Sequence, residues 1–419
     1  MTPFFLIIWG ICLTVIFSLT LVEIFPTWDG FVGSRLNLSR RAAEKGLEGG
    51  DSMEWRHLKK LGFSMGFGVG LGVLLIFSEL SLAQQRFDFY RGIRQMSMGG
   101  ASVAVVNDET SLLLNPNGLG KLRDYIITLV DPEITLGGQA ERVLGFSVHQ
   151  ALEPQKALER LREHPGRHLH FQGQMFPSVV VPNFGLGLLA KYSVDAKVTE
   201  DLTTYELNYF NDSALVTGFN FRLWHGIINL GFNARLVNRV EIREELDPQS
   251  TSLTVANLAS EGIGLASDVG LTMTAPWAYL PTFSAVLRDA GNTRYSLRRG
   301  MLLGATEQPE VTPQSLDVGL AFFPIHGNET RSTWTVEYRD VLTFSEAVDW
   351  QSRLHVGWEL NIRDALFLRA GMNRRYWTAG MELVAGHYQL QLGSFGEEVG
   401  SESQRREDRR YAGKLSYRF

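Results

Sequence analysis

The sequence contains almost no cysteine and, past its N-terminal region, no long hydrophobic run. Its one cysteine, Cys12, precedes the expected mature protein, which would then carry no thiol. Beyond residue 83 no stretch approaches the ~18 consecutive apolar residues of a membrane helix. The chain has 40 Lys and Arg against 45 Asp and Glu, and this balance argues against a nucleic-acid partner. A water-soluble fold and a β-barrel remain possible.

Motifs for catalysis are also missing. The sequence has no Gly-x-Ser-x-Gly elbow, no His-Glu-x-x-His pair and no Gly-rich phosphate loop. His164, His168 and His170 form the one histidine cluster, and their spacing matches no common metal-ligand pattern. We expect them in a solvated loop, with a metal site as the alternative. We therefore predict neither an enzyme nor a bound cofactor.

The first 83 residues have the composition of export signals. Residues 53–83 combine a basic stretch, an apolar run and small residues at Ser81 and Ala83, which predicts a secretory signal peptide cleaved before Gln84. A permanent membrane anchor is the alternative. Residues 1–52 contain a second apolar run, which we interpret as an upstream extension from an early translation start, or otherwise as an additional membrane segment.

Alternation of apolar and polar residues dominates the rest of the chain. Such alternation suits a strand with one face toward lipid and one toward the lumen of a barrel. In residues 228–236, for example, Ile228, Leu230 and Phe232 alternate with Asn229 and Gly231. Similar patterns cover the following segments: 184–192, 215–223, 316–322, 334–338, 354–360, 366–372, 377–383 and 388–392. With weaker candidates near Tyr125, Leu144, Val269 and Phe283, and the C-terminal strand, we expect about 14 strands.

The predicted architecture is an all-β transmembrane antiparallel β-barrel over residues 123–419, located in a bacterial-type outer membrane. Periplasmic turns should be short and external loops long. Residues 224–226, 276–281 and 361–364 fit short turns, whereas residues 238–265, 289–314 and 396–410 fit external loops. Residues 151–182 break the pattern as a long connection on the periplasmic side. Within it, residues 152–163 have the spacing of a short amphipathic helix, either packed on its own barrel or free for a partner.

The chain ends in an alternating strand with outward aromatic and apolar residues. The expected assembly signal consists of Tyr411, Leu415, Tyr417 and the terminal Phe419. An alternating strand that ends in Phe resembles the signal read by the outer-membrane assembly machinery. We therefore expect that machinery and outer-membrane lipid as partners.

The inward register of the predicted strands carries charged residues near one another. They are Glu337, Arg339, Glu359, Arg369 and Glu382. Opposite charges on neighbouring strands should pair in a partly wet lumen, where they hold the barrel together or, alternatively, set selectivity. Apolar inward positions are few, namely Leu189, Val216, Val286 and Phe367.

The residues before the barrel carry a family resemblance. Gly99 and Gly100 precede Ala101, and Asn115 and Pro116 begin the sequence Asn-Pro-Asn-Gly-Leu. This resembles the start of the FadL-like outer-membrane superfamily, although Asn117 stands where the family has Ala. Residues 276–295, 334–341 and 355–419 look closer to its PorV-type and related uncharacterised branch.

This resemblance implies both a plug and a function. Residues 84–122 would fold into the lumen as a plug or hatch, with a plain periplasmic tail as the alternative. Glycines suit close backbone approach there, and Asn115 with Pro116 suits a turn. We predict a channel or transporter for hydrophobic small molecules. The alternative is a scaffold that docks exported or surface proteins, so the further partner is either a hydrophobic ligand or an exported protein.

Overall fold

The computed structural model describes residues 88–140, 143, 153–249, 253–303, 307–327, 329–342, 350–399 and 406–419. The signal peptide and the N-terminal extension predicted for residues 1–83 lie outside these ranges, as does the strand expected near Leu144. Among the described residues, no helix is both long enough and apolar enough to cross a membrane.

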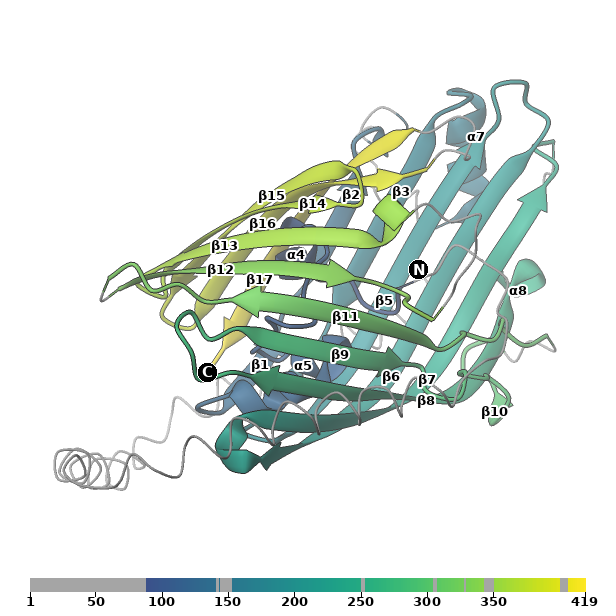
Figure 1. Cartoon of the computed structure of the whole chain (residues 1–419). Helices are drawn as coiled ribbons and strands as arrows, with labels where there is room; N and C mark the ends of the chain where they lie inside the picture. The colour runs from purple at the N-terminus through teal and green to yellow at the C-terminus, as the bar shows by residue number, and fades with distance from the viewer. Residues whose placement is uncertain are drawn as a thin grey trace, which may run out of the picture. The chain divides into compact units, whose positions relative to one another are not determined.

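The strands form one closed antiparallel sheet around an interior (Figure 1). They are β1 (Ile126–Val130), β2 (Glu133–Gly137), β3 (His168–Met175), β4 (Ser178–Val181), β5 (Phe184–Val198), β6 (Tyr205–Leu223), β7 (Ile228–Leu246), β8 (Ser260–Thr274) and β9 (Thr282–Arg288). They continue with β10 (Arg298–Arg299), β11 (Ser315–Phe322), β12 (Thr330–Tyr338), β13 (Leu354–Ile362), β14 (Leu366–Asn373), β15 (Tyr376–Ala385), β16 (Tyr388–Glu398) and β17 (Glu407–Arg418).

These segments amount to a 14-stranded barrel, as predicted. β1 and β2 together pair with β17 on one side and with β3 and β4 on the other, so each pair of segments forms one interrupted barrel strand. β10 is a two-residue segment that pairs with β8 beyond the end of β9, so it adds no strand to the ring. Pairing of β17 with β1 and β2 closes the barrel.

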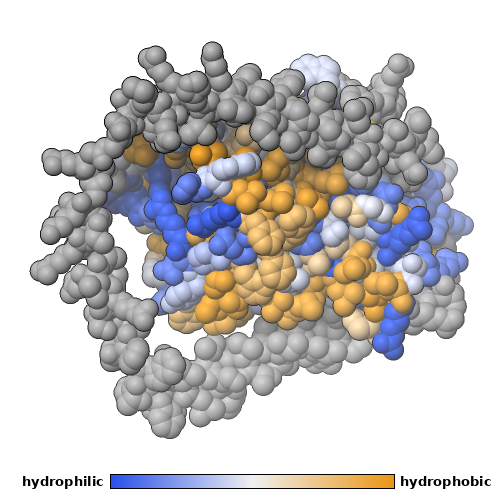
Figure 2. All heavy atoms as spheres, turned by 60° about the horizontal axis from the view of Figure 1, so that its bottom comes forward, coloured by the Kyte–Doolittle hydropathy of each residue, from blue (hydrophilic) through white to orange (hydrophobic). Residues whose placement is uncertain are grey.

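The outer surface carries the apolar half of the alternation. Leu186, Leu188, Phe219, Phe232 and Leu390 are all exposed there, while the residues between them face inward. Figure 2 shows hydrophobic side chains gathered over the middle of one face of the barrel, with hydrophilic side chains on both sides of them. Because a closed barrel leaves no unpaired edge and its outer face is apolar, it is built to span a membrane.

Exposed aromatic residues mark the rim that carries the C-terminus. They are Tyr125, Trp224, Trp277, Tyr279, Tyr388 and Phe419. Aromatic side chains favour the level of lipid headgroups. We call this edge the short-turn rim, since it holds the connections 182–183, 224–227 and 363–365, and we call the opposite edge the long-loop rim.

Two predicted connections need correction. Residues 151–182 are not one long periplasmic connection, because β3 and β4 lie within them, and the long connection is residues 138–167 on the long-loop rim. Residues 238–265 are not one loop either, since β7 extends to Leu246 and β8 begins at Ser260. The connection 289–314 and the short turns at 224–226, 276–281 and 361–364 agree with the prediction.

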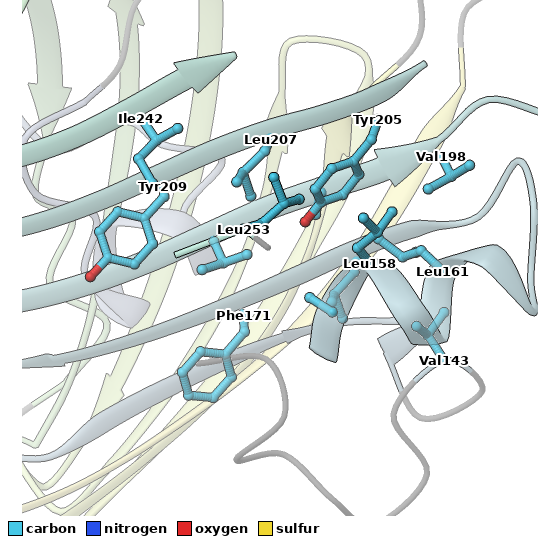
Figure 3. Packing of buried hydrophobic residues seen from close by; sticks show 14 of the residues in the cluster. Val143, Leu158, Leu161, Phe171, Val198, Tyr205, Leu207, Tyr209, Ile242 and Leu253 are labelled. Atoms are coloured by element: carbon cyan, nitrogen blue, oxygen red, sulfur yellow. The ribbon is translucent and has the colours of Figure 1, made fainter. Parts of the chain in front are cut away.

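The predicted amphipathic helix is confirmed as α7 (Pro154–Arg162). Its buried residues Ala157, Leu158 and Leu161 pack on the barrel. The strands beneath contribute Phe171, Val194 and Tyr209, which belong to the outward register. Figure 3 shows Leu158 and Leu161 on the side of the helix that faces Val198 and Tyr205. α7 therefore covers an apolar part of the outer surface near the long-loop rim.

Candidate functional site

The lumen contains the N-terminal segment, which we define as residues 88–122. It folds as α4 (Ile93–Ser97), α5 (Ser111–Leu114) and the 3-10 helix η1 (Pro116–Lys121). Figure 1 shows α4 and α5 within the ring of strands. Its first half contacts β14, β15 and β16, and its second half contacts β5, β6 and β7. We call β11 to β16 the short wall and β5 to β9 the tall wall.

The two glycines predicted for the plug motif lie where the first half touches the short wall. Gly99 has a φ of +67° and Gly100 a φ of +86°, a left-handed conformation that favours glycine. A Cβ atom on Gly99 would lie 2.5 Å from the Met372 carbonyl oxygen. His355 Nδ1 donates to the Gly99 carbonyl at 2.7 Å, and the Gly99 amide donates to Thr378 Oγ1 at 2.9 Å. Only glycine permits this backbone approach.

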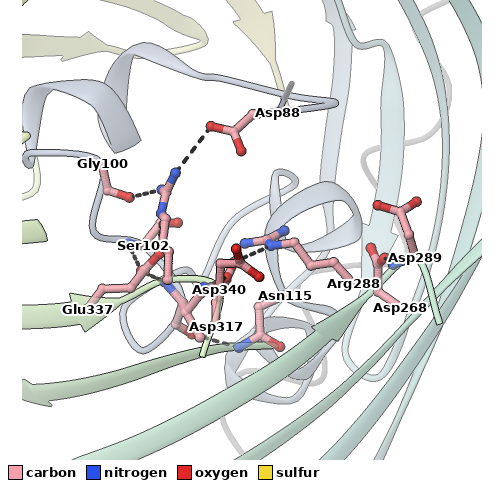
Figure 4. Close-up of polar contacts among 12 residues, drawn as sticks. Asp88, Gly100, Ser102, Asn115, Asp268, Arg288, Asp289, Asp317, Glu337 and Asp340 are labelled. Atoms are coloured by element: carbon pink, nitrogen blue, oxygen red, sulfur yellow. Dashed lines mark hydrogen bonds and ion pairs between the residues drawn. The ribbon is translucent and has the colours of Figure 1, made fainter. Parts of the chain in front are cut away.

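Glu337 and Arg339 receive the next turn of the segment. The amides of Ser102 and Val103 donate to Glu337 Oε2 at 2.6 and 2.8 Å. Arg339 donates to the Gly100 carbonyl and pairs with Glu337 at 2.8 Å. Arg339 also reaches Asp88 at 3.2 Å, and Figure 4 shows Asp88, Gly100 and Ser102 facing this region. A buried carboxylate thus satisfies amides that have no strand partner.

The other three predicted lumen charges form a second cluster. Arg369 pairs with Glu359 and with Glu382, each at 2.6 Å. Arg94 of the segment joins them, at 3.2 Å from Glu359 and 2.6 Å from Asp108. All five predicted residues therefore lie in the lumen, in two clusters that both bind the segment. Sequence reasoning did not select Arg94 as a site residue, although Arg91 and Arg94 stand three residues apart in the segment predicted to enter the lumen.

Two ionisable groups of the segment are strongly affected by this environment. Burial raises the pKa of Asp108, but the Arg94 guanidinium and the Thr110 hydroxyl outweigh it and lower the value to about 2. Burial, together with the charge of Arg94, lowers the pKa of Lys121 to about 8. Its Nζ donates to the Ala104 carbonyl at 2.7 Å.

The second half of the segment rests on the tall wall through an Asn-Pro turn. The Asn115 side chain donates to the Val103 carbonyl at 2.6 Å and to Ser284 Oγ at 2.9 Å, and it accepts from the Asn117 amide at 3.1 Å. Pro116 occupies the first turn of η1, where a missing N–H costs nothing. Asn117 donates to Thr272 Oγ1 at 3.2 Å, so the departure from the family motif has a partner in the wall.

An apolar cluster lies between the second half and the tall wall. We call it the lumen cluster; it comprises Tyr90, Val106, Leu112, Leu113, Leu114, Leu119, Leu122, Phe176, Val180, Leu189, Ala214, Val216, Val237 and Tyr295. Tyr295 comes from the connection 289–314, which enters the lumen from the other end. Of the predicted inward apolar residues, Leu189 and Val216 belong to this cluster.

Two small cavities lie beside the N-terminal segment in the described lumen. They measure about 30 Å³, beside Tyr90 and Lys414, and about 20 Å³, beside Phe89 and Arg235. Either can hold water but not an organic solute. Residues of the N-terminal segment line both cavities, so these two could widen only if that segment moved.

The histidine prediction needs correction. His168 and His170 are buried on β3 and do not lie in a solvated loop. His170 Nδ1 lies 2.7 Å from Asp195, and His168 Nδ1 lies 3.3 Å from Asp408. Inward His168 and His170 alternate with outward Leu169, which α7 covers, so both faces of this strand are buried. Within the described ranges, no group of three or more ligands fits a metal ion.

The expected assembly signal occupies the outer face of β17. Tyr411, Leu415 and Phe419 are exposed, and the Phe419 ring lies 5.2 Å from the Tyr417 ring. These exposed positions would be accessible to the outer-membrane assembly machinery. Their role in assembly stays a prediction.

Comparison with known proteins finds matches among solved structures alone. No protein-family model matches the chain, and no curated protein matches its sequence. Among solved structures, the monoaromatic hydrocarbon channel CymD matches with 10% identity, 78% of this chain and 96% of that chain covered, and a TM-score of 0.48. The toluene transporter TodX of Pseudomonas putida matches with 13% identity, coverages of 80% and 98%, and a TM-score of 0.48. A FadL homologue of Pseudomonas aeruginosa has 7% identity, coverages of 81% and 98%, and a TM-score of 0.41.

Proposed function

We propose that the protein is an outer-membrane channel for hydrophobic small molecules, in which the N-terminal segment acts as a hatch. The lumen cluster is the observation that carries this proposal. A barrel for polar solutes has a polar, water-filled interior. Here, one side of the lumen is apolar from the hatch through Leu189 and Val216 to Tyr295 of the opposite connection. An apolar solute could replace hatch side chains on this surface without leaving polar groups unpaired.

The test uses the same substitution on the two faces of the wall. Val216 is fully buried in the lumen cluster, whereas Val336 is 45% exposed on the outer face. Val216→Thr places a hydroxyl on the proposed route, at a cost of about 1–3 kcal/mol, so binding should weaken about tenfold. Val336→Thr changes a side chain on the lipid face only. Uptake of labelled toluene by cells with matched amounts of protein should fall for Val216→Thr and stay unchanged for Val336→Thr.

The second candidate is the scaffold of the PorV-type resemblance, which would use the long-loop rim. Trp350 is 60% exposed on that rim, and exposed Trp is typical of binding hot spots. Purification in mild detergent separates the two candidates. A copurified apolar molecule supports the channel. A stoichiometric protein partner, with equal toluene uptake by both Thr variants, would replace it with the scaffold.

A further inference from the structure

Residues 300–303 lie over the outer face of the barrel, although the connection that contains them begins in the lumen. Tyr295 packs inside, against the inward face of β8. The chain then passes the edge of β8, where Arg298 pairs with Ile263. Glu261 and Asn238, which receive the next residues, are on the outward register of β8 and β7, in line with the exposed Leu265 and Leu236.

Buried polar side chains fix this crossing. The amides of Leu302 and Leu303 each donate to Glu261 at 2.7 Å, and the Met301 amide donates to Asn238 Oδ1 at 3.2 Å. Asn238 also donates to Glu261 at 3.1 Å. Glu261 is only 1% exposed, so the carboxylate is covered by the residues that it binds. The backbone amides of the crossing are thereby satisfied without water, as an apolar environment requires.

The apolar side chains of residues 297–303 are exposed and do not pack against Glu261 and Asn238. Met301 is 71% exposed and Leu297 63%, while Leu302 and Leu303 are also exposed. Exposed apolar side chains gathered on one short segment in this way indicate an interaction site. Leu265 is 59% exposed on the lipid face. It is the exposed outward residue of β8 that is nearest in sequence to Glu261. The apolar group thus continues the surface that already faces lipid.

We propose that residues 297–303 are a membrane anchor whose side chains enter the acyl-chain region of the lipid that surrounds the barrel. We choose lipid as the partner of this apolar group because the group continues the lipid-facing surface of the barrel. Arg294 and Arg298 are exposed beside the apolar group, and cations at this level suit lipid phosphates. The anchor fixes the β9–β11 connection, and with it Tyr295, relative to the membrane surface. It does not depend on what the lumen carries.

The test places a fluorescent probe on single cysteines in the Cys12→Ser background. The positions are Met301→Cys and Leu303→Cys, with Leu265→Cys as the lipid-facing control. Leu202→Cys is the aqueous control, since Leu202 is an equally apolar residue, 40% exposed in another connection of the long-loop rim. The protein is reconstituted into vesicles of phosphatidylcholine brominated on the acyl chains, with no transported solute present.

We expect blue-shifted emission and bromine quenching at Met301 and Leu303, as at Leu265, and neither effect at Leu202. Two probe positions guard against a local effect of one substitution. Emission at both that matches Leu202 would overturn the anchor, and the patch would then serve a solute or a protein. Because no solute is present, this result is independent of the toluene uptake test.

Discussion

The two halves of the N-terminal segment meet the barrel through different chemistry. Residues 93–108 meet the short wall through charges and backbone hydrogen bonds, with Arg94, Glu337 and Glu359 at the centre, and through two small apolar clusters around Ile93 and Met98. Residues 111–121 meet the tall wall through leucines and two asparagine side chains. Water can replace the ion pairs and hydrogen bonds that dominate the first half, but it cannot replace the leucine contacts that dominate the second. The comparison suggests that the halves can detach separately, the first into water and the second onto an apolar solute.

Removal of Arg94 should have the largest effect and act on one half alone. Arg94→Leu leaves Glu359 and Asp108 without this partner, and breaking a buried pair costs about 3–5 kcal/mol. We expect amide hydrogen exchange to accelerate over residues 93–108 and ion conductance in planar bilayers to rise.

The matched control is Arg363→Leu, whose pair with Glu329 is 74% and 60% exposed. Such a surface pair contributes less than about 1 kcal/mol. Equal acceleration over residues 111–121 in the Arg94 variant would contradict the separation of the halves.

Substitution of wall glycines should disrupt the contacts of each half of the N-terminal segment separately. We expect this effect on amide exchange to be smaller than that of Arg94→Leu. A Cβ on Gly371 would lie 2.5 Å from the Gly99 amide, and one on Gly231 would lie 2.5 Å from the Asn117 amide. Overpacking costs about 1–3 kcal/mol. Gly371→Val should therefore expose residues 97–101 to exchange, and Gly231→Val should expose residues 115–121.

Gly413→Val is the control, because its nearest neighbour is a Leu392 methyl group 3.7 Å away. If both wall variants produced the same exchange pattern, the segment would behave as a single unit.

Acid should loosen the contacts of the first half with the short wall. We expect this to be the smallest of the three effects on amide exchange. The pKa of Asp108 in the folded protein is about 2, below the ordinary value of 3.8 for an aspartate. Its stabilisation is complete above about pH 4 and is lost as the pH falls through about 2. The difference corresponds to about 2 kcal/mol. Exchange over residues 93–108, measured in detergent from pH 5 to 2, should accelerate more than exchange over residues 111–121. Asp108→Asn should flatten that dependence; an unchanged profile would refute the role of this carboxylate.

The sequence predicted the barrel well where each wall face has one environment. Ile228, Leu230 and Phe232 face outward along β7, so their alternation was visible in the sequence. The prediction was wrong where another part of the chain covers the outer face of a strand. β3 was misinterpreted because α7 buries Leu169, and residues 238–265 were taken as a loop because Asn238 and Glu261 are polar on the outward face. The local sequence of β7 and β8 does not indicate that residues 300–303 cover their outer face.

The candidate site was predictable from one side only. The inward register placed Glu337, Glu359 and Arg369 in the lumen, because period-two alternation decides which face a residue occupies. Their partners Arg94 and Ser102 lie far away in sequence. Which inward charge meets which residue of the segment depends on how the whole ring closes, and local pattern carries no such information.

The seam between β1 and β17 also has a consequence for the order of folding. Every other barrel strand pairs with a neighbour along the chain, whereas Thr128 pairs with Arg418. This contact closes the longest loop in the barrel, carries the largest loop-closure entropy and is the natural last and slowest step. The N-terminal segment immediately precedes β1, at this seam. It can therefore take its place on the walls while the sheet is still open, and closure of the seam then encloses it.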